Sequence, residues 1–204
     1  MEEINVLNQE LNTYRLKLRP INISDLDDLY EYAKVEGVGE LAGWPHHKSI
    51  DETKKILDLM ISGNNIFSIV YKENNKMIGT LGLHKPTKPL EGKYGLEIGY
   101  VLSKDYWGIG LATEAVREVM RWLFLEKNIP YISVCHDINN PKSERVIIKN
   151  GFKFSFDFEY KTQMNTLVKS KYYYILREDY LKKKEIIQRF NETYPNDKLY
   201  EETM

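Results

Sequence analysis

Two glycines, Gly108 and Gly110, stand directly in front of a stretch that has the apolar spacing of a long amphipathic helix. Glycine costs a helix about 1 kcal/mol relative to alanine, so a pair at its entrance indicates that the backbone itself is needed there. We expect Glu114 on the outer face of this helix, which should run for about five turns. Its inward positions recur every three or four residues: Ala112, Ala115, Val116, Val119, Met120 and Leu123.

The segment before this helix has the pattern of a strand that ends near Leu102. The first four N–H groups of a helix have no partner within it, and the helix dipole favours negative charge there, so the pattern predicts a phosphate or diphosphate site. A dinucleotide-binding turn, as in an NAD-dependent oxidoreductase, would need a third glycine where Thr113 stands. A nucleoside-triphosphate loop would need a Gly-Lys-Ser/Thr that is absent. A further interpretation assigns the glycines to tight strand-to-helix packing alone.

Composition argues against several classes of partner. Twenty-nine basic and thirty acidic residues give a net charge of −1, which provides no field for gathering nucleic acid or an anionic membrane. The single cysteine, Cys135, has no partner for an internal disulfide, and no apolar run approaches the roughly 18 residues of a membrane span. We therefore expect a cytoplasmic protein, monomeric or homodimeric, without nucleic-acid or membrane partners. The four histidines show no metal-ligand spacing, so we expect no metal.

The rest of the chain alternates strands and helices. Helices are expected to open at Ser24 and at Ser49, where Glu52 completes a capping box. A short helix should follow Asn140 and end with a left-handed cap at Gly151. Strands are predicted at 14–19, 66–72, 76–84, 94–102, 131–137, 152–162 and 167–176.

Four segments carry a more specific pattern: YRLKLRPINISDLDDLYEY at 14–32, GWPHHKSIDETKKIL at 43–57, EIGYVLSKDYWGIGLATEAVREVMRWLF at 97–124, and NNPKSERVIIKNGF at 139–152. In this order they resemble the GNAT superfamily of acetyl-CoA-dependent N-acetyltransferases. The form Trp-Gly-x-Gly-x-Ala-Thr-Glu-Ala is typical of the branch that includes the ribosomal-protein-alanine N-acetyltransferases. Asp105 departs from the pattern, because many members carry Arg or Gln there.

The resemblance implies an α+β fold: a single domain with a mixed, mostly antiparallel, twisted sheet that splays between its fourth and fifth strands, with helices on both faces. It implies a GNAT domain over residues 1–180, followed by a helical extension with a frayed end over residues 181–204. Acetyl-CoA, as acetyl donor, would lie in the splay, with its pantetheine arm along exposed strand backbone and its diphosphate on the loop amides. The residues implied in binding it are Tyr100, Val101, Leu102, Trp107, Gly108, Ile109, Gly110, Leu111, Ala112, Thr113, Asn140 and Ser143.

The resemblance also implies two catalytic residues. Glu97 resembles the acidic strand residue that faces the acceptor and serves as a base, directly or through water; the alternative is an exposed strand carboxylate. Many relatives protonate the leaving thiolate with a tyrosine, but Ile147 stands at that position. In the ribosomal branch a serine at the motif's fourth position is the proposed acid, and Ser143 matches it. A helix-capping hydroxyl is the competing interpretation of Ser143.

The acceptor is expected to be a primary amine. Trp44 and His46 lie in the loop that shapes the acceptor pocket in this branch, so with Glu97 they are the candidate acceptor contacts. A peptide α-amine, with a pKa near 8, is far more often neutral at physiological pH than a lysine near 10.4, so it demands less of a base. A peptide N-terminus is therefore the expected acceptor. A small amine such as an antibiotic, polyamine or metabolite, and a non-catalytic acyl-CoA-binding module, remain alternatives.

Overall fold

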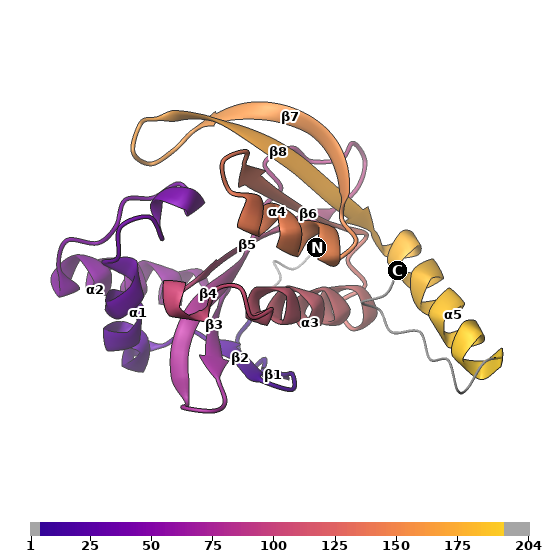
Figure 1. Ribbon diagram of the computed structural model, residues 1–204, viewed down its shortest axis with the longest axis horizontal. Coiled ribbons are helices and arrows are strands. Elements are labelled where there is room, and N and C mark those ends of the chain that lie inside the picture. The colour runs from indigo at the N-terminus through magenta and orange to yellow at the C-terminus, as the bar shows by residue number, and fades with distance from the viewer. Residues whose placement is uncertain (1–4, 194–204) are drawn as a thin grey trace.

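An eight-stranded mixed sheet in the order β1-β2-β3-β4-β5-β6-β8-β7 forms the centre of the computed structural model, which describes residues 5–193 (Figure 1). The strands are β1 (Leu11–Asn12), β2 (Leu16–Pro20), β3 (Ile66–Tyr71), β4 (Lys76–His84), β5 (Gly95–Leu102), β6 (Tyr131–Asp137), β7 (Lys153–Lys161) and β8 (Leu167–Leu176). The helices are α1 (Leu26–Ala33), α2 (Ile50–Gly63), α3 (Leu111–Leu125), α4 (Pro141–Lys149) and α5 (Arg177–Thr193), with 3₁₀ turns η1 (Ile23–Asp25), η2 (Glu40–Ala42) and η3 (Lys104–Tyr106).

The sheet opens between β5 and β6, which are its only parallel neighbours among the described strands. Their pairing covers Gly95–Glu97 with Tyr131–Ser133 and then stops, although both strands continue. The splay expected between the strands at 94–102 and 131–137 is therefore confirmed. It falls between the fifth and sixth strands because the two-residue β1 was not predicted.

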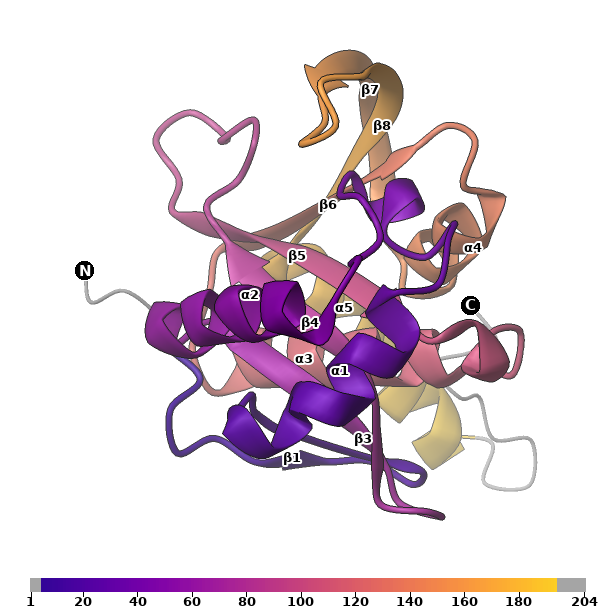
Figure 2. The same ribbon diagram turned by 90° about the vertical axis from the view of Figure 1, so that its left-hand side faces the viewer.

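Helices cover both faces of the sheet, as expected. Figures 1 and 2 show α3 and α4 on one face and α1 and α2 on the other. The α3 side holds the larger core, in which Trp122 meets Phe67 edge to face at a ring separation of 5.7 Å. A smaller core joins Leu29 and Leu57 of α1 and α2 to β3 and β4. Helix α3 covers 15 residues, about four turns, so it is slightly shorter than its sequence suggested.

The helix starts show which capping predictions hold. Asn22, not Ser24, caps the first turn, because its side chain accepts from Ser24 N–H and Asp25 closes the reciprocal bond; the α-helix proper begins at Leu26. Ser49 caps α2 as predicted, but the Glu52 carboxylate bonds to the N–H of Lys48 instead of completing the box. Asn140 caps α4 and Gly151 ends it with φ 80°, both as expected.

The hairpin of β7 and β8 arches over the open side of the sheet (Figure 1). Near its tip, the N–H of Gln163 donates to the carbonyl of Gly43, just after η2, at 3.0 Å. Strand alternation places Phe156, Phe158 and Tyr160 on one face of the arm, and a bulge between Phe154 and Phe156 shifts the register so that Phe154 lies on the other. The arm therefore joins two segments that lie more than a hundred residues apart in the sequence.

The chain leaves the sheet through α5. This helix runs without a break from Arg177 to Thr193, across the boundary at residues 180 and 181 where the extension was expected to begin. Tyr180 packs its ring against Phe124 of α3, with centroids 4.9 Å apart. The frayed end expected for the extension falls in residues 194–204, outside the described residues. None of the described helices is long and apolar enough to cross a membrane.

Candidate active site

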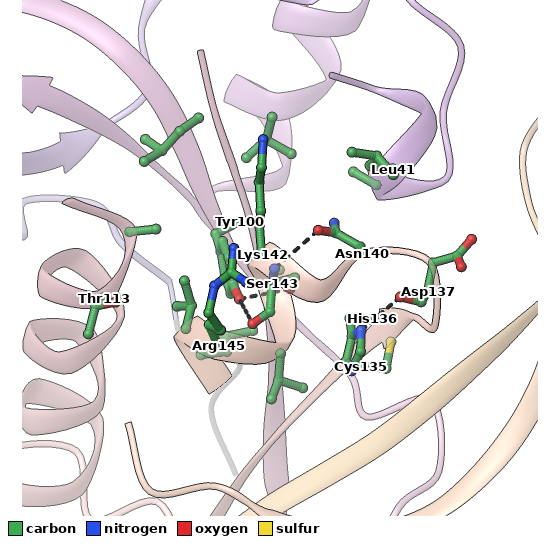
Figure 3. Close-up of a pocket in the computed structure, with 18 of the residues that line it drawn as sticks. Leu41, Tyr100, Thr113, Cys135, His136, Asp137, Asn140, Lys142, Ser143 and Arg145 are labelled. Atoms are coloured by element: carbon green, nitrogen blue, oxygen red, sulfur yellow. Dashed lines mark hydrogen bonds between the residues drawn. The ribbon is translucent and has the colours of Figure 1, made fainter. Parts of the chain in front are cut away.

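A cavity of about 510 Å³ occupies the splay between β5 and β6 (Figure 3). Its walls come from β5, the entrance of α3, β6, α4, β7 and the segment around η2. The cavity therefore gathers residues from most of the chain. Among the predicted site residues, its lining includes Glu97, Tyr100, Val101, Leu102, Trp107, Gly108, Gly110, Leu111, Ala112, Thr113, Asn140 and Ser143.

Strand β5 presents one free edge and two different faces to this cavity. Beyond Glu97 no pairing with β6 continues in the described part of the chain, so backbone groups of the last five residues of β5 face the opening. Val101 packs with the α1 and α2 core, whereas Tyr100 and Leu102 pack with the α3 core. The predicted alternation is thus correct, and the indole N–H of Trp107 ties the next loop to the Leu102 carbonyl at 2.8 Å.

The glycine loop forms an open cradle of amides. Gly108 and Gly110 have φ angles of 82° and 86°, a left-handed backbone that L side chains rarely adopt. Gly110 caps α3 without a side chain, and the first bond of the helix runs from Glu114 N–H to the Gly110 carbonyl. The N–H groups of the three residues between them therefore have no acceptor within the helix. A Cβ built at Gly108 would meet no atom within 4 Å. The cradle suits a diphosphate.

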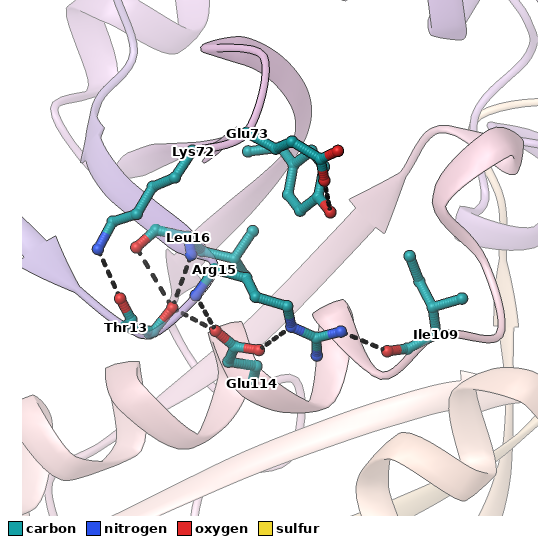
Figure 4. Close-up of polar contacts among 8 residues, drawn as sticks. Thr13, Arg15, Leu16, Lys72, Glu73, Ile109 and Glu114 are labelled. Carbon is teal, nitrogen blue, oxygen red and sulfur yellow. Dashed lines mark hydrogen bonds and ion pairs between the residues drawn. The ribbon is translucent and has the colours of Figure 1, made fainter.

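A partly buried ion pair fixes this loop from behind (Figure 4). The Glu114 carboxylate receives Arg15 Nε at 2.7 Å and Thr13 Oγ1 at 2.5 Å, while Arg15 Nη1 donates to the Ile109 carbonyl at 2.8 Å. Burial opposes ionisation of Glu114, but these hydrogen bonds lower its pKa below the ordinary value. Glu114 therefore points toward the protein, contrary to our expectation. The Ile109 side chain is exposed and does not line the cavity. Ile109 contributes to the loop through its carbonyl, which accepts the hydrogen bond from Arg15.

Helix α4 adds positive charge that the sequence analysis missed. Lys142, Arg145 and Lys149 all line the cavity, at a spacing that places them on one face of the helix. The Lys142 ammonium lies 4.1 Å from the centre of the Trp107 ring. The helical spacing after the Asn140 cap was a signal that could have identified this basic face. Its cations complement the amide cradle.

Ser143 and Tyr100 form a hydroxyl pair beside the cradle (Figure 3). Ser143 Oγ lies 2.9 Å from the Tyr100 hydroxyl, and the Ser143 N–H donates to Asn140 Oδ1 at 3.1 Å. Burial raises the pKa of Tyr100 well above its ordinary value, so the phenol remains a donor at neutral pH. Ile147 is buried in the core, one per cent exposed, and carries no polar group. The cavity wall formed by the start of α4 therefore offers the Ser143 hydroxyl, which is hydrogen-bonded to Tyr100.

Glu97 lies on the opposite face of β5, eight per cent exposed. Its two oxygens accept from the N–H of Thr87 at 2.9 Å and from Thr87 Oγ1 at 2.7 Å. Cys135 of β6 lies next to it, at 3.7 Å from sulfur to oxygen. Burial, together with the Glu97 charge, raises the pKa of the Cys135 thiol to about 12, so this thiol is unsuited to act as a nucleophile.

Two predicted acceptor contacts lie outside the cavity lining. Trp44 packs over Gly39 and against the His47 ring, at a centroid distance of 5.2 Å. His46 Nδ1 bonds to Glu40 at 2.7 Å. The same segment instead contributes Val38, Leu41 and Ala42 to the lining. The sequence analysis also did not predict five further lining residues: His84, Thr87, Asp137, Phe158 and Tyr160. No group of three metal-ligating side chains occurs in the described part of the chain.

Comparison with known proteins identifies the family. The model of the acetyltransferase (GNAT) domain matches residues 15–153. The chain is 28% identical over 151 residues to an uncharacterised N-acetyltransferase, p20, from Bacillus licheniformis, covering 71% of this chain and 83% of that protein.

Two solved structures share the fold. A ribosomal-protein-S5-alanine acetyltransferase from Vibrio fischeri is 20% identical, with a TM-score of 0.67 over 84% of this chain and 98% of its own. A spermidine N-acetyltransferase from Vibrio cholerae, in complex with CoA and spermine, is 19% identical, with a TM-score of 0.68 over 83% of this chain and 99% of its own. The chain therefore belongs to the GNAT family and is an acetyl-CoA-dependent N-acetyltransferase.

Proposed function

We propose that this enzyme acetylates the N-terminal α-amine of a peptide or protein, by direct attack of the amine on the thioester in a ternary complex. One observation carries the proposal: a single cavity joins the amide cradle on one face of the sheet to Glu97 on the other. A donor held at the cradle and an acceptor held near Glu97 meet in the splay, so the transfer requires no covalent acyl-enzyme intermediate.

The donor side suits acetyl-CoA, which supplies the activated acetyl thioester when bound. The N–H groups at the start of α3 and the cations of Lys142, Arg145 and Lys149 would hold its phosphates. The free edge of β5 would pair with the amides of its pantetheine arm, as an added strand does. Asn140 lies within reach of the same arm, although its Oδ1 already caps α4.

Ser143 is the proposed donor of a proton to the departing sulfur. Its hydroxyl lies in the cavity lining and is hydrogen-bonded to the Tyr100 hydroxyl, which remains protonated. Ile147 cannot donate a proton from the position where many relatives carry tyrosine. We propose that the Ser143–Tyr100 pair supplies this step.

The acceptor side favours a cationic group. Glu97 and Asp137 carry negative charge, Phe158 and Tyr160 provide aromatic surface, and no lysine or arginine lines this part of the cavity in the described residues. An α-amine fits because its pKa near 8 leaves a useful neutral fraction at physiological pH. The likeness to the S5-alanine acetyltransferase supports a protein N-terminus. The likeness to the spermidine acetyltransferase and the acidic lining favour a small polyamine as the second candidate.

Release of CoA thiol from acetyl-CoA tests these functions. The purified protein is assayed with peptides whose N-termini are free or blocked, and with a set of small amines that includes a polyamine. Release that requires a free N-terminus supports the proposal, and variation of the first residue then defines specificity. Release with small amines only selects the second candidate. Acetyl-CoA binding without release from any amine would contradict both and favour a non-catalytic binding module.

A further inference from the structure

A histidine that the sequence analysis set aside lies at the acceptor end of the cavity. His84 is the last residue of β4, and its direct neighbour across the sheet is Glu97 of β5. Both line the cavity. Alternation along the strands places both side chains on the face that carries α1 and α2, opposite to Ser143.

The imidazole occupies a recess made by two glycines. Gly82 and Gly99 are cross-strand partners one step further along the same face. A Cβ at Gly82 would lie 2.5 Å from His84 Nε2, and a Cβ at Gly99 would lie 3.7 Å from it. The ring therefore lies over both glycines and reaches from β4 toward the splay. Any side chain at Gly82 would push it away.

Glu97 and His84 differ in how many hydrogen bonds they already make within the protein. Both oxygens of Glu97 accept hydrogen bonds from Thr87, which fixes the carboxylate and the loop that follows β4. His84 has no hydrogen-bond partner among the described residues, and its side chain stays accessible. A lone pair of the neutral ring is therefore free to accept a proton on this face.

We infer that His84 is the catalytic base that takes the proton from the acceptor amine, while Glu97 attracts and orients the ammonium. This inference rests on the proposed function. In the step, one N–H bond of the ammonium breaks, its electron pair remains on nitrogen as the attacking lone pair, and the proton bonds to the unprotonated ring nitrogen of His84. The imidazolium formed in this way lies beside the Glu97 carboxylate, which stabilises it.

The surroundings of the ring suit this task. The surrounding cavity residues partly desolvate the His84 ring, which stays accessible, and lower its pKa below the ordinary value against the opposing effect of Glu97. The ring is thus neutral at physiological pH. Other titratable groups in the lining on this side are Cys135 and Asp137 of β6 and Tyr160 of β7; the segment around η2 contributes apolar residues.

The test is the pH dependence of kcat/KM for the acceptor, from about pH 5.5 to about pH 9. With increasing pH, the kcat/KM of the wild-type enzyme should rise through the lowered pKa of His84 and then level off. His84→Ala should be about 100-fold slower near neutral pH, and its rate should keep rising toward the pKa of the amine itself. Added imidazole should restore part of the His84→Ala rate. Lys88→Gln, an exposed change in the same segment, should match the wild type.

Acetyl-CoA binding by each variant serves as the folding control. If His84→Ala does not fold, His84→Gln keeps the size of the side chain and answers the same question. A variant that binds acetyl-CoA and keeps the wild-type pH profile would overturn the inference and leave the proposed function intact. A wild-type enzyme that acetylates no amine would defeat the proposed function instead.

Discussion

The two halves of the cavity that we propose for the donor and for the acceptor are built in different ways. The donor half comes from two nearly continuous segments, the glycine loop with α3 and the start of α4. The acceptor half comes from the end of β4, the middle of β5, the segment around η2 and the β7–β8 arm. The first half depends on local backbone geometry, whereas the second depends on how distant segments meet. Substitutions should therefore separate donor binding from acceptor handling.

The largest effect is expected on the donor side, from Gly108→Asp. A Cβ at Gly108 would meet no atom within 4 Å, so Asp there adds a carboxylate beside the diphosphate cradle without a clash. Like charges in contact cost several kcal/mol, so acetyl-CoA affinity, measured by calorimetric titration, should fall by about 100-fold or more. Gly108→Asn is the matched control, because asparagine has the same shape and tolerates a positive φ, here 82°. Equal affinity of the two variants would contradict the location of the diphosphate.

An intermediate effect is expected from the hydroxyl pair. Ser143→Ala should lower kcat by about tenfold to 100-fold, with little change in KM for acetyl-CoA. Tyr100→Phe keeps the packed ring and should lower kcat by a smaller factor. If Tyr100 acts through Ser143, the double variant should be no slower than Ser143→Ala alone. Effects that multiply would show that Tyr100 contributes by another route.

The smallest effect is expected on the acceptor side, from Glu97→Gln. Glutamine retains an acceptor for Thr87 but loses the charge that attracts an ammonium, so turnover at neutral pH should fall and the acceptor KM should rise by roughly three- to tenfold. Acetyl-CoA affinity should not change. Glu91→Gln makes the same charge change on the exposed part of the β4–β5 loop and should have no effect. A loss of acetyl-CoA affinity in Glu97→Gln would remove the distinction between the halves.

The glycine loop and the starts of α3 and α4 were predictable because their sequence signals are local. Glycines with positive φ, the Asn140 cap and the helical period of α3 each operate within a few residues of one another. The orientation of Glu114 was not predictable in this way, because its partners Thr13 and Arg15 lie about a hundred residues earlier. A charged residue on an amphipathic helix ordinarily faces solvent.

The acceptor half was less predictable for the same physical reason. His84 gains its position from Gly82 and Gly99, and the role of those glycines becomes visible only when β4 and β5 are paired. Trp44 and His46 were selected from the motif, but their side chains turn toward His47 and Glu40. The strand at 14–19 and the splay were recovered because hydrophobic alternation and family resemblance both pointed to them.

The hydrogen bond between Gln163 and Gly43 ties two walls of the cavity to each other. The β7–β8 arm contributes Phe158 and Tyr160 to the lining, and the segment around η2 contributes Leu41 and Ala42. Because the bond links the backbones of these two segments, neither wall can move outward alone without breaking it. The two walls therefore behave as one mechanical unit, although more than a hundred residues of chain separate them.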